Sequence, residues 1–134
     1  MPSVAKNLQN VSLVLKIFRI FVARIKLYRN MKRPEVVKQI SQTIHRIEPT
    51  ATAILYGSEA RGDARPDSDI DVLILLDGEQ RDLKREWNIT GELYEIELAT
   101  GVLVNPMIML RKQWENRPFK TPFYVNVINE GVRI

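Results

Sequence analysis

The stretch from residue 53 to residue 77 constrains the fold of this chain more than any other. A short apolar run, AILY (53–56), has the length and composition of a buried strand. Gly57 and Ser58 follow it, and glycine allows a sharp turn in which the backbone approaches a ligand closely. After an irregular segment, a second apolar run, IDVLILL (70–76), carries an aspartate at its second position. This pattern predicts two strands connected through a glycine turn and a loop.

Two aspartates at the head of the second strand predict a metal site. Asp69 and Asp71 lie two residues apart, so their side chains project from the same side of an extended chain. Nearby carboxylates repel each other, and an unpaired charge in an apolar strand is costly. Mg²⁺ relieves both problems, because it commonly binds one or two carboxylates together with water and substrate phosphates. Asp67 stands between Pro66 and Ser68 and is expected in the turn, as a weaker candidate ligand.

The residues after Gly57 are suited to binding a phosphate group. Ser58 offers a hydroxyl and a backbone N–H, and the EAR segment (59–61) can open a helical turn whose unpaired N–H groups attract anions. A structural alternative treats Gly-Ser as a common turn and Asp-Ser-Asp as a solvated loop. That alternative leaves Asp71 unexplained inside an apolar strand. We therefore interpret this stretch as a site for a metal-bound nucleoside triphosphate.

These motifs together resemble a known signature. Gly57-Ser58, ten intervening residues and Asp69-x-Asp71 are similar to the signature of the DNA polymerase beta-like nucleotidyltransferase superfamily. More narrowly, GSEARGDARPDSDIDVLILL (57–76) resembles the minimal nucleotidyltransferases, small single-domain proteins often paired with a HEPN-domain partner. The match is dense here and looser from Pro34 to the C-terminus. The resemblance implies an α+β nucleotidyltransferase fold, in which a small mixed β-sheet packs on helices in two layers.

The resemblance also implies a reaction. A nucleoside monophosphate, expected to be AMP from ATP, would pass to an acceptor with release of pyrophosphate. Gly57 and Ser58 would hold the terminal phosphates. Asp69 and Asp71 would be the catalytic carboxylates and would bind one or two Mg²⁺ ions, on the triphosphate and near the attacking oxygen.

Two parts of the resemblance are open. Arg61 or Arg65 could neutralise phosphate charge, and each could equally be a solvated loop arginine. Fully active superfamily members add a third carboxylate on a later strand, but the matching strand here, VLVNPMIML (102–110), has none, and Asn105 is the polar residue nearest the expected position. Glu95 and Glu97 are expected on the preceding helix. The missing third carboxylate therefore argues against turnover but not against nucleotide binding.

Two main hypotheses follow for the function. The first is an enzyme that adenylylates a partner protein, an antitoxin-like member of a HEPN-domain pair. The second is a catalytically degraded antitoxin or binding subunit that acts by contact. A weaker third is modification of a small molecule or an RNA end, which usually requires an additional domain. The acceptor site is expected to be completed by a partner or a second copy, in a homo- or hetero-oligomer, and the resemblance implies a cytoplasmic protein.

Charge divides the chain into two predicted regions. The net charge is +4, but residues 1–30 carry six basic and no acidic side chains, so residues 31–134 carry a net −2. The latter range is the expected nucleotidyltransferase domain, and its charge does not indicate nucleic-acid binding. Residues 1–30 form a basic apolar extension whose charges argue against a membrane span. It is an amphipathic helix for a membrane surface or acidic partner, a helix docked on the domain, or a stretch outside the native domain, with Met31 as the natural start.

The remaining pattern predicts the other elements. Helices are expected at 34–48, 80–99 and 122–130, strands at 52–56, 70–76 and 102–110, and an extended piece at 131–134. Pro106 places the 102–110 strand at a sheet edge or a bulge, and Trp114 is expected in the following loop. The residues expected to face inward from the 80–99 helix are Leu83, Trp87, Leu93, Tyr94 and Ile96. The chain has no cysteine, which excludes disulfides and thiolate metal sites, and its single histidine, His45, argues against a His-based triad.

Overall fold

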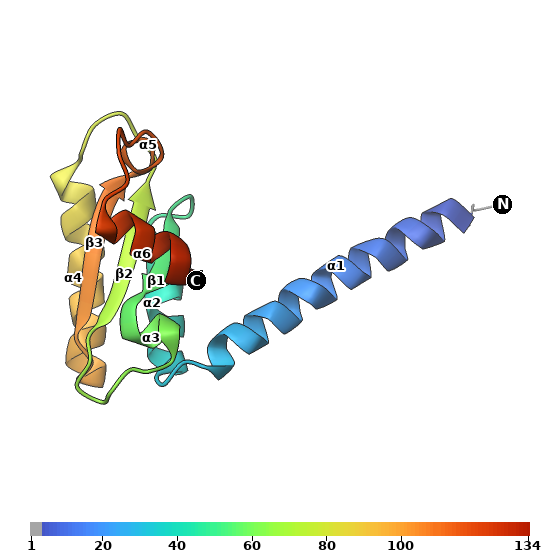
Figure 1. Cartoon of the computed structure of the whole chain (residues 1–134), viewed down its shortest axis with the longest axis horizontal. Helices are drawn as coiled ribbons and strands as arrows, with labels where there is room; N and C mark the ends of the chain where they lie inside the picture. Colours follow the sequence, from blue (N-terminus) through green and yellow to red (C-terminus); the bar gives the residue numbers. More distant parts are fainter. Residues whose placement is uncertain (1–3) are drawn as a thin grey trace. The chain divides into compact units, whose positions relative to one another are not determined.

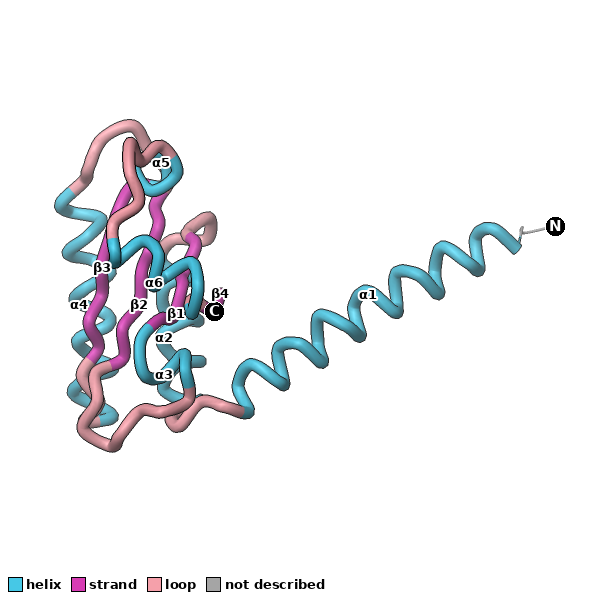
Figure 2. Tube along the Cα trace, in the orientation of Figure 1, coloured by secondary structure: helices cyan, strands magenta, loops and turns pink. Residues whose placement is uncertain are grey.

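The computed structural model describes residues 4–134, which form six helices and four strands (Figures 1 and 2). The first three residues of the predicted extension lie outside the described residues. The elements in chain order are α1 (Val4–Arg29), α2 (Pro34–Ile47), β1 (Thr52–Tyr56), α3 (Gly57–Arg61), β2 (Ile70–Leu76), α4 (Leu83–Thr100), β3 (Val104–Leu110), α5 (Arg111–Glu115), α6 (Pro122–Glu130) and β4 (Val132–Arg133).

The chain separates into two compact units, one ending at Asn30 and one running from Met31 to Ile134. The first consists of α1, whose apolar side chains, among them Leu8 and Phe18, are largely exposed. Among the described residues, no helix combines the length and the apolar composition that crossing a bilayer requires. Whether the N-terminal unit belongs to the native domain stays a prediction.

The second unit is built on a four-stranded mixed sheet with the order β3-β2-β1-β4. β1 pairs antiparallel with β2 and with β4, whereas β2 pairs parallel with β3. α2 and α4 pack against each other and lie behind the strands in Figure 1, with α6 in front. The expected α+β class, with a small mixed sheet packed on helices, is confirmed. β3 is an edge strand, as Pro106 predicted, and it begins at Val104 rather than at residue 102.

The two faces of β2 pack against different layers. Leu73 and Leu75 form a cluster with Trp114 of α5 and Val127 of α6. Asp71 has the same parity in the strand, so it projects toward the face that carries α5 and α6. This alternation decides which helices can reach the carboxylate.

Three residues expected in the core lie on the surface of α4. Leu83, Trp87 and Tyr94 are 52%, 71% and 55% exposed, so the prediction that they face inward was wrong. The prediction for Leu93 and Ile96 was correct, since both are buried. α4 carries two apolar stripes at helical spacing, and the sheet and α2 can cover only one of them.

The beginning of α4 also differs from the prediction. The helix begins at Leu83 rather than at residue 80, because the Asp82 carboxylate accepts hydrogen bonds from the backbone N–H groups of Lys84 and Arg85, at 3.0 and 3.2 Å. This N-cap ends the preceding loop and fixes the first turn. At the other end, Gly101 closes the helix in the left-handed conformation.

Trp114 was expected in a loop but lies in the short helix α5, where it is 7% exposed. Its ring centroid is 4.8 Å from that of Tyr124 and 6.1 Å from that of Phe123, and the Arg117 guanidinium stacks over it at 4.6 Å. The helix has only five residues and directly follows β3, so it shows no periodicity in the sequence. Trp114 anchors α6 to the sheet.

Candidate functional site

The site is centred on the turn between β1 and α3. Gly57 adopts φ +74°, a left-handed conformation that favours glycine. A Cβ built on Gly57 would lie 2.6 Å from Oδ2 of Asp71, closer than two such atoms approach. Glycine is therefore required here both for the backbone conformation and for the close approach of the carboxylate. The turn predicted to bind phosphate and the predicted metal ligand Asp71 are in direct contact.

Asp71 is half-buried between residues of the two neighbouring strands. It stands opposite Tyr56 of β1 and opposite Asn105 of β3 in the sheet register. The Asn105 side chain donates a hydrogen bond from Nδ2 to Oδ1 of Asp71 at 3.0 Å. Burial, and after it the negative charge of Asp71, raise the pKa of Tyr56 above its ordinary value. In the part of the chain that the structure describes, no lysine or arginine forms an ion pair with Asp71.

Asp69 directly precedes β2 and is exposed. The structure thus places both predicted carboxylates at the same end of this strand, and Asp67 lies in the preceding turn, as expected. Across residues 4–134, no three His, Cys, Asp or Glu side chains gather into a set that could hold a metal ion by themselves. Two oxygen ligands are the number that Mg²⁺ accepts from protein when substrate phosphates and water complete its shell. The donor set fits a magnesium ion that binds together with a nucleotide.

Asn105, the polar residue nearest the position where a third carboxylate was expected, stands directly across from Asp71 in the parallel register. Neither nearby glutamate replaces it. Glu97 is half-buried on α4, and its Oε1 accepts from the backbone N–H of Val104 at 2.7 Å, while Glu95 is exposed on the same helix. The amide of Asn105 orients Asp71 by hydrogen bonding but carries no negative charge.

The two candidate arginines lie in different surroundings. Arg61 donates from Nη1 to Oε2 of Glu130 at 3.0 Å and from Nε to Oδ2 of Asp63 at 3.2 Å. These hydrogen bonds, the one to Glu130 first, raise the pKa of Arg61, which stays cationic. Arg65 instead is exposed and lines a pocket of about 320 Å³. The other residues of this pocket are Lys32, Arg33, Ala64 and Pro66.

Ser58 is half-buried in α3, and its carbonyl oxygen accepts from the backbone N–H groups of Gly62 and Asp63, each at 3.0 Å. This closes α3 after one turn and sends the chain into the loop before Asp69. Gly62, at φ +83°, supplies the left-handed residue that the C-cap requires.

Sequence reasoning missed Glu130, the last residue of α6. Its Oε1 accepts from the backbone N–H of Gly57 at 3.1 Å, and its Oε2 accepts from Arg61. Gly57 and Glu130 are 73 residues apart, and no local motif marks the glutamate. Only the packing of α6 over the sheet brings it to the turn.

A second missed residue is Glu59, the one fully buried charged side chain among the described residues. Its carboxylate accepts from the backbone N–H and from Nε of Arg33, at 2.6 and 3.0 Å. Arg33 in turn donates from Nη1 to the carbonyl oxygen of Ser68 at 2.6 Å. This buried pair connects α3 to the residue before Asp69 and positions the loop that carries the carboxylate.

Comparison with known proteins finds related proteins that match most of this chain. The profile of a family described as "Nucleotidyltransferase domain" matches residues 37–132. A Methanocaldococcus jannaschii protein named "Putative protein adenylyltransferase" is 33% identical over 102 residues, which is 75% of this chain and 96% of the relative. A solved chain described as "Crystal structure of the toxin-antitoxin with AMP-PNP" has the same fold, with a TM-score of 0.51, 20% identity, and coverage of 72% of this chain and 69% of that chain. The chain therefore belongs to the nucleotidyltransferase domain family and is an enzyme of the minimal nucleotidyltransferase type.

Proposed function

We propose that this protein binds ATP with Mg²⁺ and transfers AMP to a partner protein. One observation carries the proposal: the glycine turn packs directly against Asp71, a half-buried carboxylate with no cationic partner among the described residues. A triphosphate on the turn would thus lie beside the carboxylate that shares its metal. The name of the Methanocaldococcus relative and the AMP-PNP of the solved toxin-antitoxin support the choice of donor.

In this reaction, a hydroxyl oxygen of the acceptor forms a bond to the α-phosphorus. The bond from that phosphorus to the bridging oxygen breaks, pyrophosphate leaves, and the hydroxyl proton passes to solvent. The Gly57-Ser58 backbone and the Arg61 guanidinium hold the terminal phosphates by charge-assisted hydrogen bonds. Asp69 and Asp71 would hold Mg²⁺, which would supply positive charge to neutralise the phosphates. Asn105 keeps the Asp71 carboxylate in position.

The acceptor in this proposal is a HEPN-domain protein that forms a toxin-antitoxin pair with this chain. The solved chain of the same fold comes from a toxin-antitoxin structure, which supports a protein partner. Residues 31–134 are occupied by one small domain with a single sheet, so an acceptor surface is best completed by a partner or a second copy.

A second candidate function rests on Asn105. A neutral amide can neither accept the proton of the attacking hydroxyl nor hold a second metal ion as a carboxylate does. Under this alternative, the chain is a degraded nucleotidyltransferase that retains nucleotide binding and inhibits its partner by contact.

The experiment that distinguishes AMP transfer from inhibition by contact uses the full chain. Calorimetric titration with ATP, with and without Mg²⁺, measures donor binding, and incubation of the chain and its partner with ATP labelled at the α-phosphate measures transfer. Magnesium-dependent binding with label on the partner is the expected result. Magnesium-dependent binding without label supports the contact inhibitor. Absence of ATP binding in both conditions overturns the donor site itself.

A further inference from the structure

The Glu130 carboxylate accepts hydrogen bonds from two of the groups that the proposed function assigns to the terminal phosphates. The two oxygens of Glu130 accept from two separate groups: the backbone N–H of Gly57 at 3.1 Å and Nη1 of Arg61 at 3.0 Å. The Glu130 side chain is 24% exposed and that of Arg61 is 47% exposed, so the contact borders solvent. A ligand can therefore reach it without opening the core.

The backbone of Glu130 is fixed by its neighbours. A Cβ on Gly131 would lie 2.2 Å from the carbonyl oxygen of Val127 and 2.8 Å from Cγ2 of Ile54, so the chain leaves α6 pressed against β1. Val132 then pairs with Leu55 in the sheet. The fold thus holds Glu130 above the glycine turn, and only its side chain is free to rotate.

A carboxylate and a phosphate can accept hydrogen bonds from these same donors. Both are anions, and both accept charge-assisted hydrogen bonds from a backbone N–H and a guanidinium. One N–H cannot serve both at full strength, and Arg61, which also pairs with Asp63, would then carry a third anion. Glu130 and a bound triphosphate therefore exclude each other from this position.

We propose that Glu130 is a resident competitor for the triphosphate: it neutralises Arg61 and occupies the Gly57 N–H in the nucleotide-free protein, and the nucleotide displaces it. This inference rests on the proposed function and adds a regulator of donor affinity to it. Simple anions such as phosphate gain only the two donors that Glu130 gives up. Mg-ATP also gains the carboxylates of Asp69 and Asp71 through its metal, so the exchange selects a metal-bound triphosphate.

The test compares Glu130→Gln with Glu95→Gln in the full chain. Both variants remove one negative charge, but Glu95 is exposed on α4 and has no contact with the turn. The probes are Mg-ATP and metal-free inorganic tripolyphosphate, titrated by calorimetry. Glu130→Gln is expected to bind both probes roughly three- to tenfold more tightly than the parent, the range expected when a partly exposed ion pair no longer opposes binding. Glu95→Gln is expected to match the parent.

Two results overturn the proposal. Equal affinities in Glu130→Gln and the parent would make Glu130 a structural residue only. Weaker binding in Glu130→Gln would mean that the carboxylate assists the ligand, for instance through the metal. If Mg-ATP binds to none of the proteins, the proposed function fails, but the tripolyphosphate titrations still decide the role of Glu130.

A measurement on the parent protein covers the case in which Glu130→Gln does not fold. Saturation with Mg-ATP should shift the NMR signals of the Glu130 side-chain carboxyl carbon and of the Gly57 amide, because their hydrogen bond breaks. The Glu95 carboxyl carbon serves as the internal control. A Glu130 signal that stays in place at saturation contradicts displacement.

Discussion

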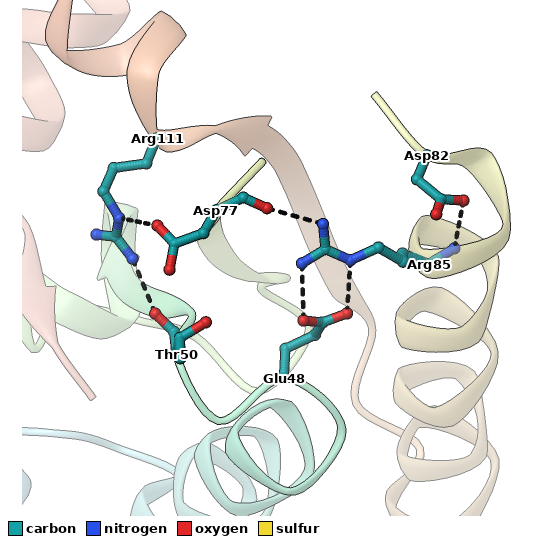
Figure 3. A network of polar contacts seen from close by, with 6 residues as sticks. All are labelled: Glu48, Thr50, Asp77, Asp82, Arg85 and Arg111. Carbon is teal, nitrogen blue, oxygen red and sulfur yellow. Dashed lines mark hydrogen bonds and ion pairs between the residues drawn. The ribbon is translucent and has the colours of Figure 1, made fainter. Parts of the chain in front are cut away.

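The two ends of β2 hold carboxylates in opposite ways. At its C-terminal end, Asp77 accepts from Nε of Arg111 at 2.8 Å, and Arg85 donates to both oxygens of Glu48 at 2.9 and 2.8 Å (Figure 3). At its N-terminal end, Asp71 contacts a glycine and an asparagine, with no arginine or lysine paired to it among the described residues. At the C-terminal end, arginines of the same domain neutralise the carboxylates. At the N-terminal end, the charge of Asp71 is left for a ligand to neutralise.

The arginines at the C-terminal end of β2 lower the pKa values of the carboxylates they contact. A hydrogen bond from Arg85 holds the pKa of Glu48 below its ordinary value, and one from Arg111 does the same for Asp77. These carboxylates therefore favour the folded state when ionised. At the other end, Asp71 has no such partner among the described residues, although a half-buried charge is costly without one. Keeping it there is consistent with a binding role.

Asp71→Ala should have the largest effect of these substitutions, because it removes the carboxylate that has no cationic partner among the described residues. Magnesium-dependent ATP binding should weaken by about a hundredfold or more, since even the outer partners of a metal ligand are worth roughly 10- to 100-fold. The melting temperature should stay equal or rise, because like charge is removed. Asp77→Asn is the matched control at the other end of β2: it should lower the melting temperature and leave binding intact. An Asp71→Ala variant that binds Mg-ATP like the parent would refute the site assignment.

Gly57→Ala tests the contact between the turn and the carboxylate. The left-handed backbone costs a residue with a Cβ roughly 1–2 kcal/mol, and the new methyl group would also displace Asp71. Both stability and ATP binding should fall. Gly91→Ala is the control, since nothing lies within 4 Å of its added Cβ and it stands inside α4. That substitution should stabilise the protein by about 0.5–1 kcal/mol, as measured by chemical denaturation.

Arg85→Met tests the ion pair with Glu48 near the C-terminal end of β2. The substitution keeps the apolar stem of the side chain and removes its charge. Stability at neutral pH should fall by about 1 kcal/mol, with ATP binding unchanged. The pKa of Glu48 is lowered in the folded parent from 4.5, so the benefit of the pair is present above that value and disappears as the pH falls. The difference between the parent and Arg85→Met should thus be full above about pH 5 and shrink in more acidic solution. Arg46→Met, which removes a pair with Glu92 whose side chains are 63% and 44% exposed, should cause little change at any pH.

Asn105→Asp is expected to have the smallest effect on stability and adds the missing third carboxylate. Without metal, it should destabilise the protein by roughly 0.5 kcal/mol, because like charges then face each other across β2 and β3. Mg²⁺ should raise its melting temperature more than that of the parent, and AMP transfer should increase. A variant that responds to Mg²⁺ no more than the parent would show that position 105 lies outside the metal's reach.

The sequence alone determined the elements that carry the site. Apolar runs of strand length predicted β1 and β2 at their observed bounds, and Pro106 predicted the edge position of β3, because these properties depend on neighbouring residues only. The placement of Gly57 between the strand and the short helix followed from the same local chemistry. The predicted roles of Asp69 and Asp71 remain proposals, although the structure places both at the same end of β2.

Only the tertiary structure decided which surfaces and distant groups meet. Two apolar stripes on α4 are equivalent in sequence, and packing against α2 and the sheet chose the one containing Leu93 over the one containing Trp87. Asn105 reaches Asp71 through the register of β2 and β3. Glu130 reaches Gly57 because α6 packs across the sheet. Such contacts depend on how whole helices and strands pack together. The residues within any one element do not determine that packing, so its sequence does not predict these contacts.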